Sequence, residues 1–183
     1  MSVRVDQVAD KNDYFAQGLL DKLDATDPVF AAYEAQDVSH EVGFDFDDFQ
    51  SVVPRALDEI RETKEAYEET GPEGREHFGD EVADIMFSLI NLARHAGISD
   101  LPTFEHVLAS LPEGAIEVED TIACVDSIGA RITAAAAVES NDPTHFNEVM
   151  HHLFTSGMHD SIRIALAHGF VPQDLLRENV RKY

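Results

Sequence analysis

The chain has 183 residues, of which 44% are hydrophobic, so it can bury a core, and this composition excludes a globally disordered chain. Its formal net charge is -23, from 36 acidic residues against 13 basic ones. Nucleic acids and anionic membranes bind basic surfaces, so this balance argues against both as partners.

Long stretches of the chain have apolar residues spaced three and four apart, interrupted by Pro and Gly, which predicts an all-α helical bundle. Asp47 or Asp48 is suited to cap the third helix, Gly97 to close the fourth, and Pro172 to begin the last. Residues 71–74, Gly-Pro-Glu-Gly, are expected to break the chain before the fourth helix. The expected helices, in chain order, cover residues 13–23, 27–38, 48–69, 75–95, 103–110, 119–139, 144–168 and 172–183.

The order of helix, breaker, longer helix and Gly occurs twice, and residues 91–97 have a counterpart in residues 164–169. This pattern favours a degenerate duplication of a helical hairpin, packed as an internal pseudo-dimer; a homodimer is the other arrangement we expect. The predicted units are residues 1–99, a connector over 100–118, and a degenerate repeat over 119–183 that includes the closing helix 172–183.

Cys124 is the only cysteine, so no intramolecular disulfide can form. Residues 1–13 contain no apolar run of signal-peptide length, and no run of about 18 apolar residues occurs in the sequence. The sequence therefore predicts a cytoplasmic protein that does not span a membrane.

The helix over residues 81–94 is apolar on almost every face, which is typical of a buried helix. The preceding helix carries Glu59 and Glu62, three residues apart and therefore on one side. A short turn between the two helices predicts antiparallel packing that brings their carboxylates together. Five polar residues nevertheless share one stripe of the apolar helix, at steps of three and four: Glu81, Asp84, Ser88, Asn91 and His95.

Carboxylates inside a bundle are unfavourable unless a cation meets them. Four carboxylates, without Cys and without His at the same spacing, favour a magnesium or manganese site for a phosphate ester. The alternative is that Glu59 and Glu62 face solvent, because residues 58–69 are rich in Glu. That alternative is weaker for Glu81 and Asp84, whose helix is too apolar to be exposed.

These acids resemble the EExxE…ExxD signature of MazG-like pyrophosphohydrolases, with Asp58-Glu59-x-x-Glu62 followed by Glu81-x-x-Asp84. Three further segments resemble that family: residues 43–46, before the first acidic helix; residues 83–94; and residues 169–183, at the C-terminus. The resemblance covers residues 18–99 and 169–183, and it implies a MazG-like helical bundle.

The sequence departs from the family pattern at four positions: Asp58 replaces Glu, Ala83 replaces Gly, Phe46 replaces Trp, and Val180 falls where the closing Asn is expected. Residues 100–168 form an insertion or a second repeat, which lacks the four acids.

The resemblance implies magnesium-dependent hydrolysis of a nucleoside triphosphate, NTP or dNTP, to monophosphate and pyrophosphate. The metal ligands would be Glu59, Glu62, Glu81 and Asp84, and manganese could replace magnesium. Asp58, beside the cluster, is the candidate base for the attacking water, and Glu62 is a second catalytic candidate. The predicted substrate contacts are Phe46, Asn91, Arg94, Arg181 and Lys182. The alternative for Arg94, Arg181 and Lys182 is that they are ordinary surface cations near helix ends. The alternative for Phe46 is that it packs in the core.

Two other classes of protein stay open. A ferritin-like di-metal oxidase needs two Glu-x-x-His motifs, whereas this chain has one, Glu148-x-x-His151. A non-catalytic nucleotide- or metal-binding sensor or scaffold is the stronger rival. His145, His152 and His159 recur every seven residues, so a transition-metal site on their helix is a further alternative to partly exposed histidines.

Overall fold

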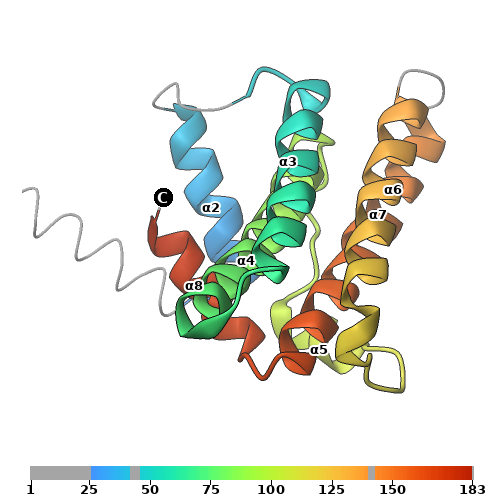
Figure 1. The fold of residues 1–183 in the computed structure, drawn as a ribbon. Helices are drawn as coiled ribbons and strands as arrows, with labels where there is room; N and C mark the ends of the chain where they lie inside the picture. Colours follow the sequence, from blue (N-terminus) through green and yellow to red (C-terminus); the bar gives the residue numbers. More distant parts are fainter. Residues whose placement is uncertain (1–25, 42–45, 140–142, 183) are drawn as a thin grey trace, which may run out of the picture.

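The structure is a computed structural model that describes residues 26–41, 46–139 and 143–182. Every regular element in these residues is helical, which confirms the predicted all-α bundle (Figure 1). The expected helix over residues 13–23 and the segment 43–45 lie outside the described residues. The elements are α2 (Pro28–Glu41), α3 (Phe49–Tyr67), α4 (Gly71–His95), α5 (Phe104–Ala109), the 3-10 turn η1 (Val118–Asp120), α6 (Thr121–Glu139), α7 (Pro143–Ala167) and α8 (Pro172–Lys182).

The ends of these helices follow from local chemistry. Asp48 caps α3, because its carboxylate accepts a hydrogen bond from the Ser51 backbone N–H at 2.9 Å in a capping box. Gly97, with φ +76°, follows α4 in the left-handed conformation that glycine adopts without strain. Pro172 is the first residue of α8, as its fixed φ and missing N–H favour.

The start of α4 differs from the prediction. Residues 71–74 were expected to break the chain, whereas the helix begins at Gly71 and includes them in its first turn. Pro72 is compatible with this first turn, because a backbone N–H at this position would have no helical partner and proline has none to leave unpaired. Gly71, with φ +86°, supplies the sharp change of direction from α3.

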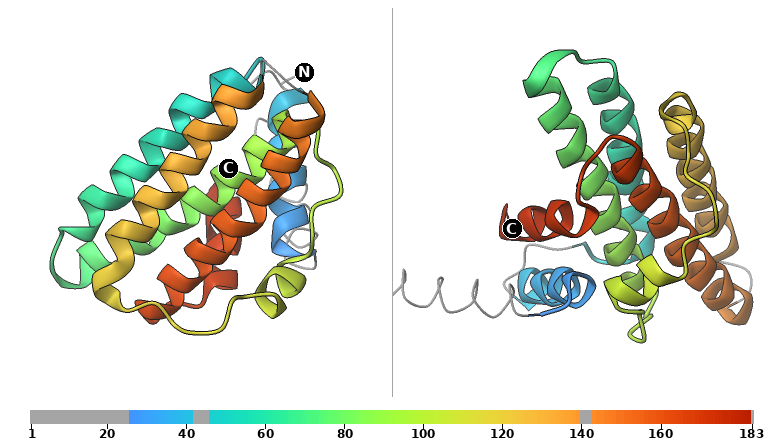
Figure 2. Two further views of the ribbon diagram at one scale, coloured as in Figure 1. Left: turned by 90° about the vertical axis from the view of Figure 1, so that its right-hand side faces the viewer. Right: turned by 90° about the horizontal axis from the view of Figure 1, so that it is seen from below.

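Helix α4 lies at the centre of the bundle and contacts α2, α3, α7 and α8. Figures 1 and 2 show the α6–α7 hairpin on one side of α4 and the pair α2 and α8 on the other. The expected burial of α4 is confirmed, and its fully covered apolar residues include Val82, Ile85, Met86, Leu89, Ile90 and Leu92. A polar side chain on this helix therefore either meets a partner or lies at a seam between helices.

The α6–α7 hairpin packs against α3 and α4 through close contacts at glycines. A Cβ atom at Gly157 of α7 would lie 2.8 Å from Leu89 Cδ1, and one at Gly129 of α6 would lie 3.2 Å from Ile60 Cγ2. Both contacts bring the second hairpin close to the first. The origin of this hairpin by duplication, and the division of the chain into two units, stay predictions.

One segment of the described residues, Val118–Glu139, is long and apolar enough to cross a membrane when judged by length and composition alone. Its helix, α6, contacts α3 and α7 and buries Val125, Ile128 and Ile132 within the bundle. About a third of this apolar window is buried, and packing inside the bundle accounts for that part of its apolar character.

Candidate metal centre

Three carboxylates meet where α3 and α4 pack together. Glu59 and Glu62 come from adjacent turns of α3 and Glu81 from α4, and each offers an oxygen within 4.8 Å of the other two. The Thr63 hydroxyl lies 2.7 Å from the carbonyl oxygen of Glu59 and 3.3 Å from that of Glu81, which ties the two helices together at this level. The group therefore lies on a fixed part of the helical hairpin.

Two of these carboxylates are buried. Glu59 is 2% exposed and Glu81 is 9% exposed, and in each the Oε2 atom is buried without a hydrogen-bond partner among the described residues. A buried carboxylate oxygen without a partner is unfavourable, and a bound cation removes that penalty. Glu62 is partly exposed, with 33% of its side chain accessible, so it opens the group to solvent. Three carboxylates in this arrangement have the geometry to hold a metal ion, and oxygen ligands fit a hard cation such as Mg²⁺ or Mn²⁺.

Asp84, the fourth predicted ligand, lies beside this group and not in it. The three ligand atoms within 4.8 Å of one another come from Glu59, Glu62 and Glu81. Asp84 Oδ1 instead accepts a hydrogen bond from Asn179 Nδ2 at 2.7 Å. Its charge still acts on the group, because it raises the pKa of both Glu59 and Glu81.

Asn179 is a site residue that the sequence reasoning missed. It lies on α8, is 1% exposed, and its Oδ1 atom is buried without a hydrogen-bond partner among the described residues. The family resemblance placed Val180 at the position of the expected closing Asn, and Val180 is buried in the apolar core. The side chain that reaches the acids is therefore that of Asn179, one residue before Val180. Only the way α8 packs against α4 determines which of these two residues faces the acids.

Two basic side chains that were also missed contact the acids. Arg55 Nη2 lies 2.7 Å from Glu59 Oε1, and Arg55 Nη1 lies 3.5 Å from Glu62 Oε2. His77 Nε2 lies 3.2 Å from Glu81 Oε1, and its Nδ1 lies 3.1 Å from Glu69 Oε2. Arg55 and His77 each precede a buried acid by four residues, so the i, i+4 spacing is the signal that could have identified them.

The proton affinities in the group follow from burial and crowding. Burial, and after it the charge of Asp84, raises the pKa of the Glu59 carboxyl to about 8. Burial is also the main cause that raises the pKa of Glu81 and of Asp84. The hydrogen bond to Glu69 raises the pKa of His77. A cation bound among these carboxylates would favour their charged forms and offset the burial.

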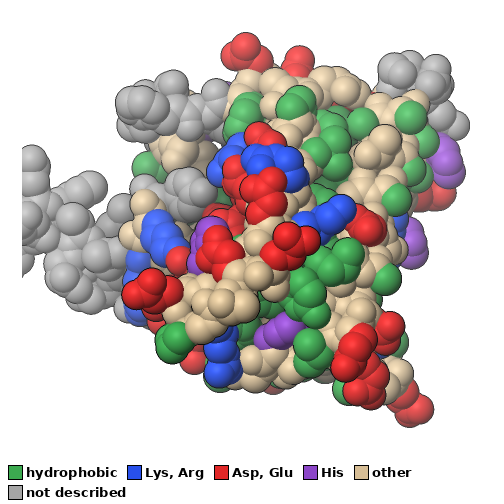
Figure 3. Space-filling view, viewed as in Figure 1, with side chains coloured by type: hydrophobic (Ala, Val, Ile, Leu, Met, Phe, Trp, Pro, Cys, Tyr) green, Lys and Arg blue, Asp and Glu red, His purple; other side chains and the backbone are tan. Residues whose placement is uncertain are grey.

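Asp58, the candidate base, lies outside the group. Its side chain is 53% exposed, and Oδ1 pairs with Arg61 Nε at 3.2 Å. The same guanidinium contacts Glu62 at 3.0 Å and Glu65 at 2.7 Å, so it connects Asp58 to the edge of the acidic group. In Figure 3, acidic and basic side chains gather over α3. The role of Asp58 stays a prediction.

The predicted substrate contacts near the acids lie on α8. Lys182 Nζ pairs with Asp80 Oδ2 at 2.8 Å, and its charge partly offsets the rise that burial causes in the pKa of Asp84, so it lies within electrostatic reach of the acids. Arg181 is exposed in the last turn of α8.

The other predicted contacts lie toward the C-terminal end of α4, where Asn91 and Arg94 are about 10 and 15 Å along the helix from Asp84 at the rise of an α-helix. Arg94 Nη1 pairs with Asp37 of α2 at 3.3 Å, and its side chain is 9% exposed, so this arginine connects two helices. Arg94 Nη2 also donates to Asn91 Oδ1 at 3.3 Å. The Phe46 ring packs edge-on against His95, with centroids 6.3 Å apart. These residues form a second group, separate from the three carboxylates.

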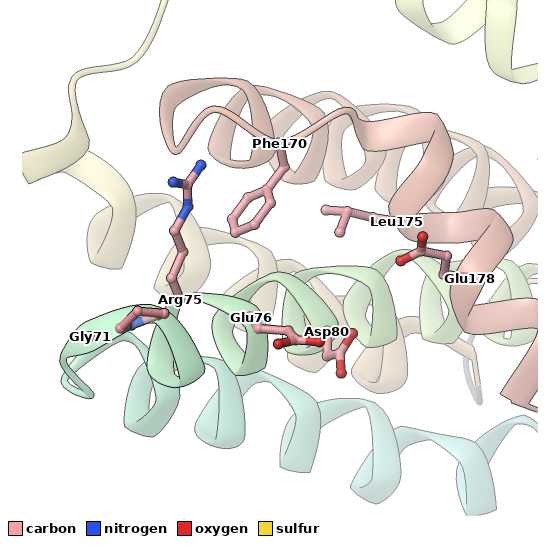
Figure 4. Close-up of a pocket in the computed structure, with 8 residues that line it drawn as sticks. Gly71, Arg75, Glu76, Asp80, Phe170, Leu175 and Glu178 are labelled. Carbon is pink, nitrogen blue, oxygen red and sulfur yellow. The ribbon is translucent and has the colours of Figure 1, made fainter.

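A pocket of about 550 Å³ lies between α4 and the α7–α8 segment (Figure 4). The Arg75 guanidinium stands 5.2 Å from the centre of the Phe170 ring and hydrogen-bonds to the carbonyl oxygen of His168 at 3.0 Å. Asp80, which lines the pocket, directly precedes Glu81 on α4. Sequence reasoning did not identify the pocket, because its residues come from segments far apart in the chain. The lining residues are Gly71, Pro72, Arg75, Glu76, Asp80, Phe170, Leu175 and Glu178.

Three histidines of α7, His145, His151 and His159, have three different partners. His159 Nε2 lies 3.0 Å from the Ser110 hydroxyl, and burial lowers the pKa of this histidine. His145 faces Glu148 at 4.0 Å, and His151 faces Asp100 at 3.7 Å. Among the residues that the structure describes, the three carboxylates are the one group with metal-binding geometry. The structure therefore lends no support to a transition-metal or di-metal site on α7.

Compared with protein-family models, curated proteins and solved structures, the chain matches none. These comparisons neither support nor contradict the family resemblance seen in the sequence.

Proposed function

We propose that the chain is a magnesium-dependent, MazG-like pyrophosphohydrolase that converts a nucleoside triphosphate, NTP or dNTP, into the monophosphate and pyrophosphate. The observation that carries this proposal is the pair of buried carboxylates, Glu59 and Glu81, each with an unpartnered oxygen and both in a group with Glu62. A structural role alone leaves these oxygens unsatisfied, whereas a divalent cation would satisfy both.

Under this proposal Glu59, Glu62 and Glu81 hold the metal. Magnesium, when bound, would neutralise charge on the polyphosphate and increase the acidity of water. Asp84 lies beside the three ligands and is fixed by the 2.7 Å hydrogen bond from Asn179, so it can orient a water or complete the ligand set. Glu62 is the better-placed proton acceptor of the two predicted, because it is partly exposed and belongs to the group.

The charge of the chain supports a bridging metal. At a net charge of -23, the protein repels a polyphosphate unless a cation or a local basic group intervenes. Lys182 and Arg181, at the end of α8, would supply such local charge beside the acids. Phe46 and Asn91, at the other end of α4, would then contact the nucleoside.

A non-catalytic nucleotide or metal sensor is the second candidate. The contacts of Arg55 with Glu59 at 2.7 Å and of His77 with Glu81 at 3.2 Å favour it, because they give these acids partners without any metal. This candidate uses the same ligands and differs in lacking turnover.

The test is a panel of NTPs and dNTPs, incubated with magnesium, in which pyrophosphate release is followed. We compare the unsubstituted protein with Glu59→Gln, which keeps the shape but removes the charge. The matched control is Glu148→Gln, a change at an acid on α7 whose side chain is 78% exposed. Release that needs magnesium and is lost only in Glu59→Gln supports the enzyme. Binding of nucleotide without release supports the sensor.

A further inference from the structure

Arg55 is placed to compete with the metal for two of its three ligands, an inference that rests on the proposed function. It lies four residues before Glu59 and seven before Glu62, so all three side chains share one stripe of α3. The guanidinium contacts Glu59 at 2.7 Å and Glu62 at 3.5 Å. These are two of the carboxylates whose oxygens lie within 4.8 Å of one another.

Both carboxylate oxygens of Glu62 already face a cationic partner. Arg55 contacts its Oε2 atom, and Arg61 contacts its Oε1 atom at 3.0 Å. Arg61 also holds Asp58 and Glu65, whereas Arg55 has the longer contact to Glu62. Arg55 is therefore the partner that a metal would displace, and repulsion between the two cations acts in the same direction.

Displacement of Arg55 needs no rearrangement of the core. Its side chain is 46% exposed, whereas that of its main partner, Glu59, is 3% exposed. The long stem can turn the guanidinium toward solvent, where the polyphosphate of a metal-bound nucleotide would lie. A guanidinium can bind a phosphate group through two parallel N–H···O hydrogen bonds.

We propose that Arg55 is a built-in counter-ion: it pairs with Glu59 and Glu62 in the metal-free protein and turns to the substrate polyphosphate when metal binds. The arginine would then oppose metal binding alone and favour metal binding together with a polyphosphate. An ordinary surface ion pair on a helix would have neither effect.

The experiment measures metal and pyrophosphate affinity separately, by calorimetry on the full chain. The variants are Arg55→Gln and, as the matched control, Lys64→Gln. Lys64 lies on the same helix with a side chain that is 42% exposed, but it pairs with Asp126 of α6. Manganese chloride is titrated first, without nucleotide. Inorganic pyrophosphate is then titrated in saturating magnesium.

Arg55→Gln is expected to bind Mn²⁺ about tenfold more tightly and pyrophosphate about tenfold more weakly, a typical coupling between two sites. Lys64→Gln should change both affinities less than threefold, and Arg55→Lys should recover part of the pyrophosphate affinity. Opposite changes in the two affinities support the proposal, because a residue that only maintains the fold would weaken both.

Two results overturn the role of Arg55. If Arg55→Gln binds Mn²⁺ with unchanged or lower affinity, the metal centre stands and the counter-ion does not. If neither the unsubstituted protein nor Arg55→Gln binds Mn²⁺, both the counter-ion and the proposed metal centre are wrong. Binding of Mn²⁺ by Arg55→Gln alone would support strong competition.

Discussion

At the scale of single residues, Glu59 is a buried acid whose position calls for a physical explanation. It is 2% exposed, only one of its carboxylate oxygens meets Arg55, and burial raises its pKa to about 8. Its neighbours on α3 show that Ala or Ile fits at this depth, since Ala56 and Ile60 are buried there. A carboxylate in this position makes physical sense as part of a cation site.

The first prediction concerns pH. Near neutral pH, folded Glu59 keeps a proton that the unfolded chain loses above its ordinary pKa of 4.5. The folded state thus binds more protons, so its stability falls as pH rises from 4.5 to about 8, by up to about 1.4 kcal/mol per pH unit from this group. Glu59→Gln should flatten this slope in urea denaturation without metal. An unchanged slope would show that Glu59 is already ionised in the folded protein.

The raised pKa of Glu59 also makes metal binding depend on pH. Metal binds the carboxylate and not the carboxyl form, so Mn²⁺ affinity should rise with pH until about pH 8. Calorimetry in buffers of different ionisation enthalpy should detect a proton released on binding at neutral pH.

The second prediction concerns Asn179. Asn179→Leu keeps the branched shape of the side chain but removes the 2.7 Å hydrogen bond to Asp84. Asp84 then loses the bond that orients it, so Mn²⁺ affinity should fall several-fold and unfolding free energy should fall by about 1–3 kcal/mol. Val180→Leu, a purely apolar change at the next residue, should lower stability alone. If the two variants lose metal affinity equally, the side chain that serves the acids is not specific to position 179.

At the scale of elements, the sequence predicted what depends on local pattern. Periodicity located the helices, and the i, i+3 spacing of Glu59 with Glu62, together with a short turn, predicted that they approach Glu81. The choice between Asn179 and Val180 depends on how α8 lies against α4, which no local pattern contains. The pocket could not be predicted from local pattern either, because Arg75 and Phe170 meet only through tertiary packing.

The third prediction tests the contact between α7 and α4. A Cβ at Gly157 would lie 2.8 Å from Leu89 Cδ1 in the core, so Gly157→Ala should destabilise the protein by about 1–3 kcal/mol. Alanine otherwise favours a helix over glycine by about 1 kcal/mol, which makes a net loss diagnostic of crowding. The double variant Gly157→Ala with Leu89→Val should recover part of the loss in urea denaturation. A stabilised Gly157→Ala protein would mean that the two helices are not packed this closely.

At the scale of the whole molecule, charge and metal binding act together. A net charge of -23 destabilises the compact state by self-repulsion, and salt screens that repulsion. Any salt should therefore raise the melting temperature, while a bound cation should raise it further.

The fourth prediction separates the two effects. Magnesium chloride should raise the melting temperature more than sodium chloride of equal ionic strength, because magnesium binds the folded state specifically. The excess should vanish in Glu59→Gln and persist in Glu148→Gln. An equal excess in all three proteins would assign the effect to the acidic surface.

The measurement that tests the central claim most directly is product identity, read by phosphorus NMR after incubation with magnesium and each nucleoside triphosphate of the panel. The account predicts monophosphate and pyrophosphate, formed by the unsubstituted protein and by Glu148→Gln but not by Glu59→Gln. Diphosphate with orthophosphate, or no turnover of any triphosphate, would contradict it.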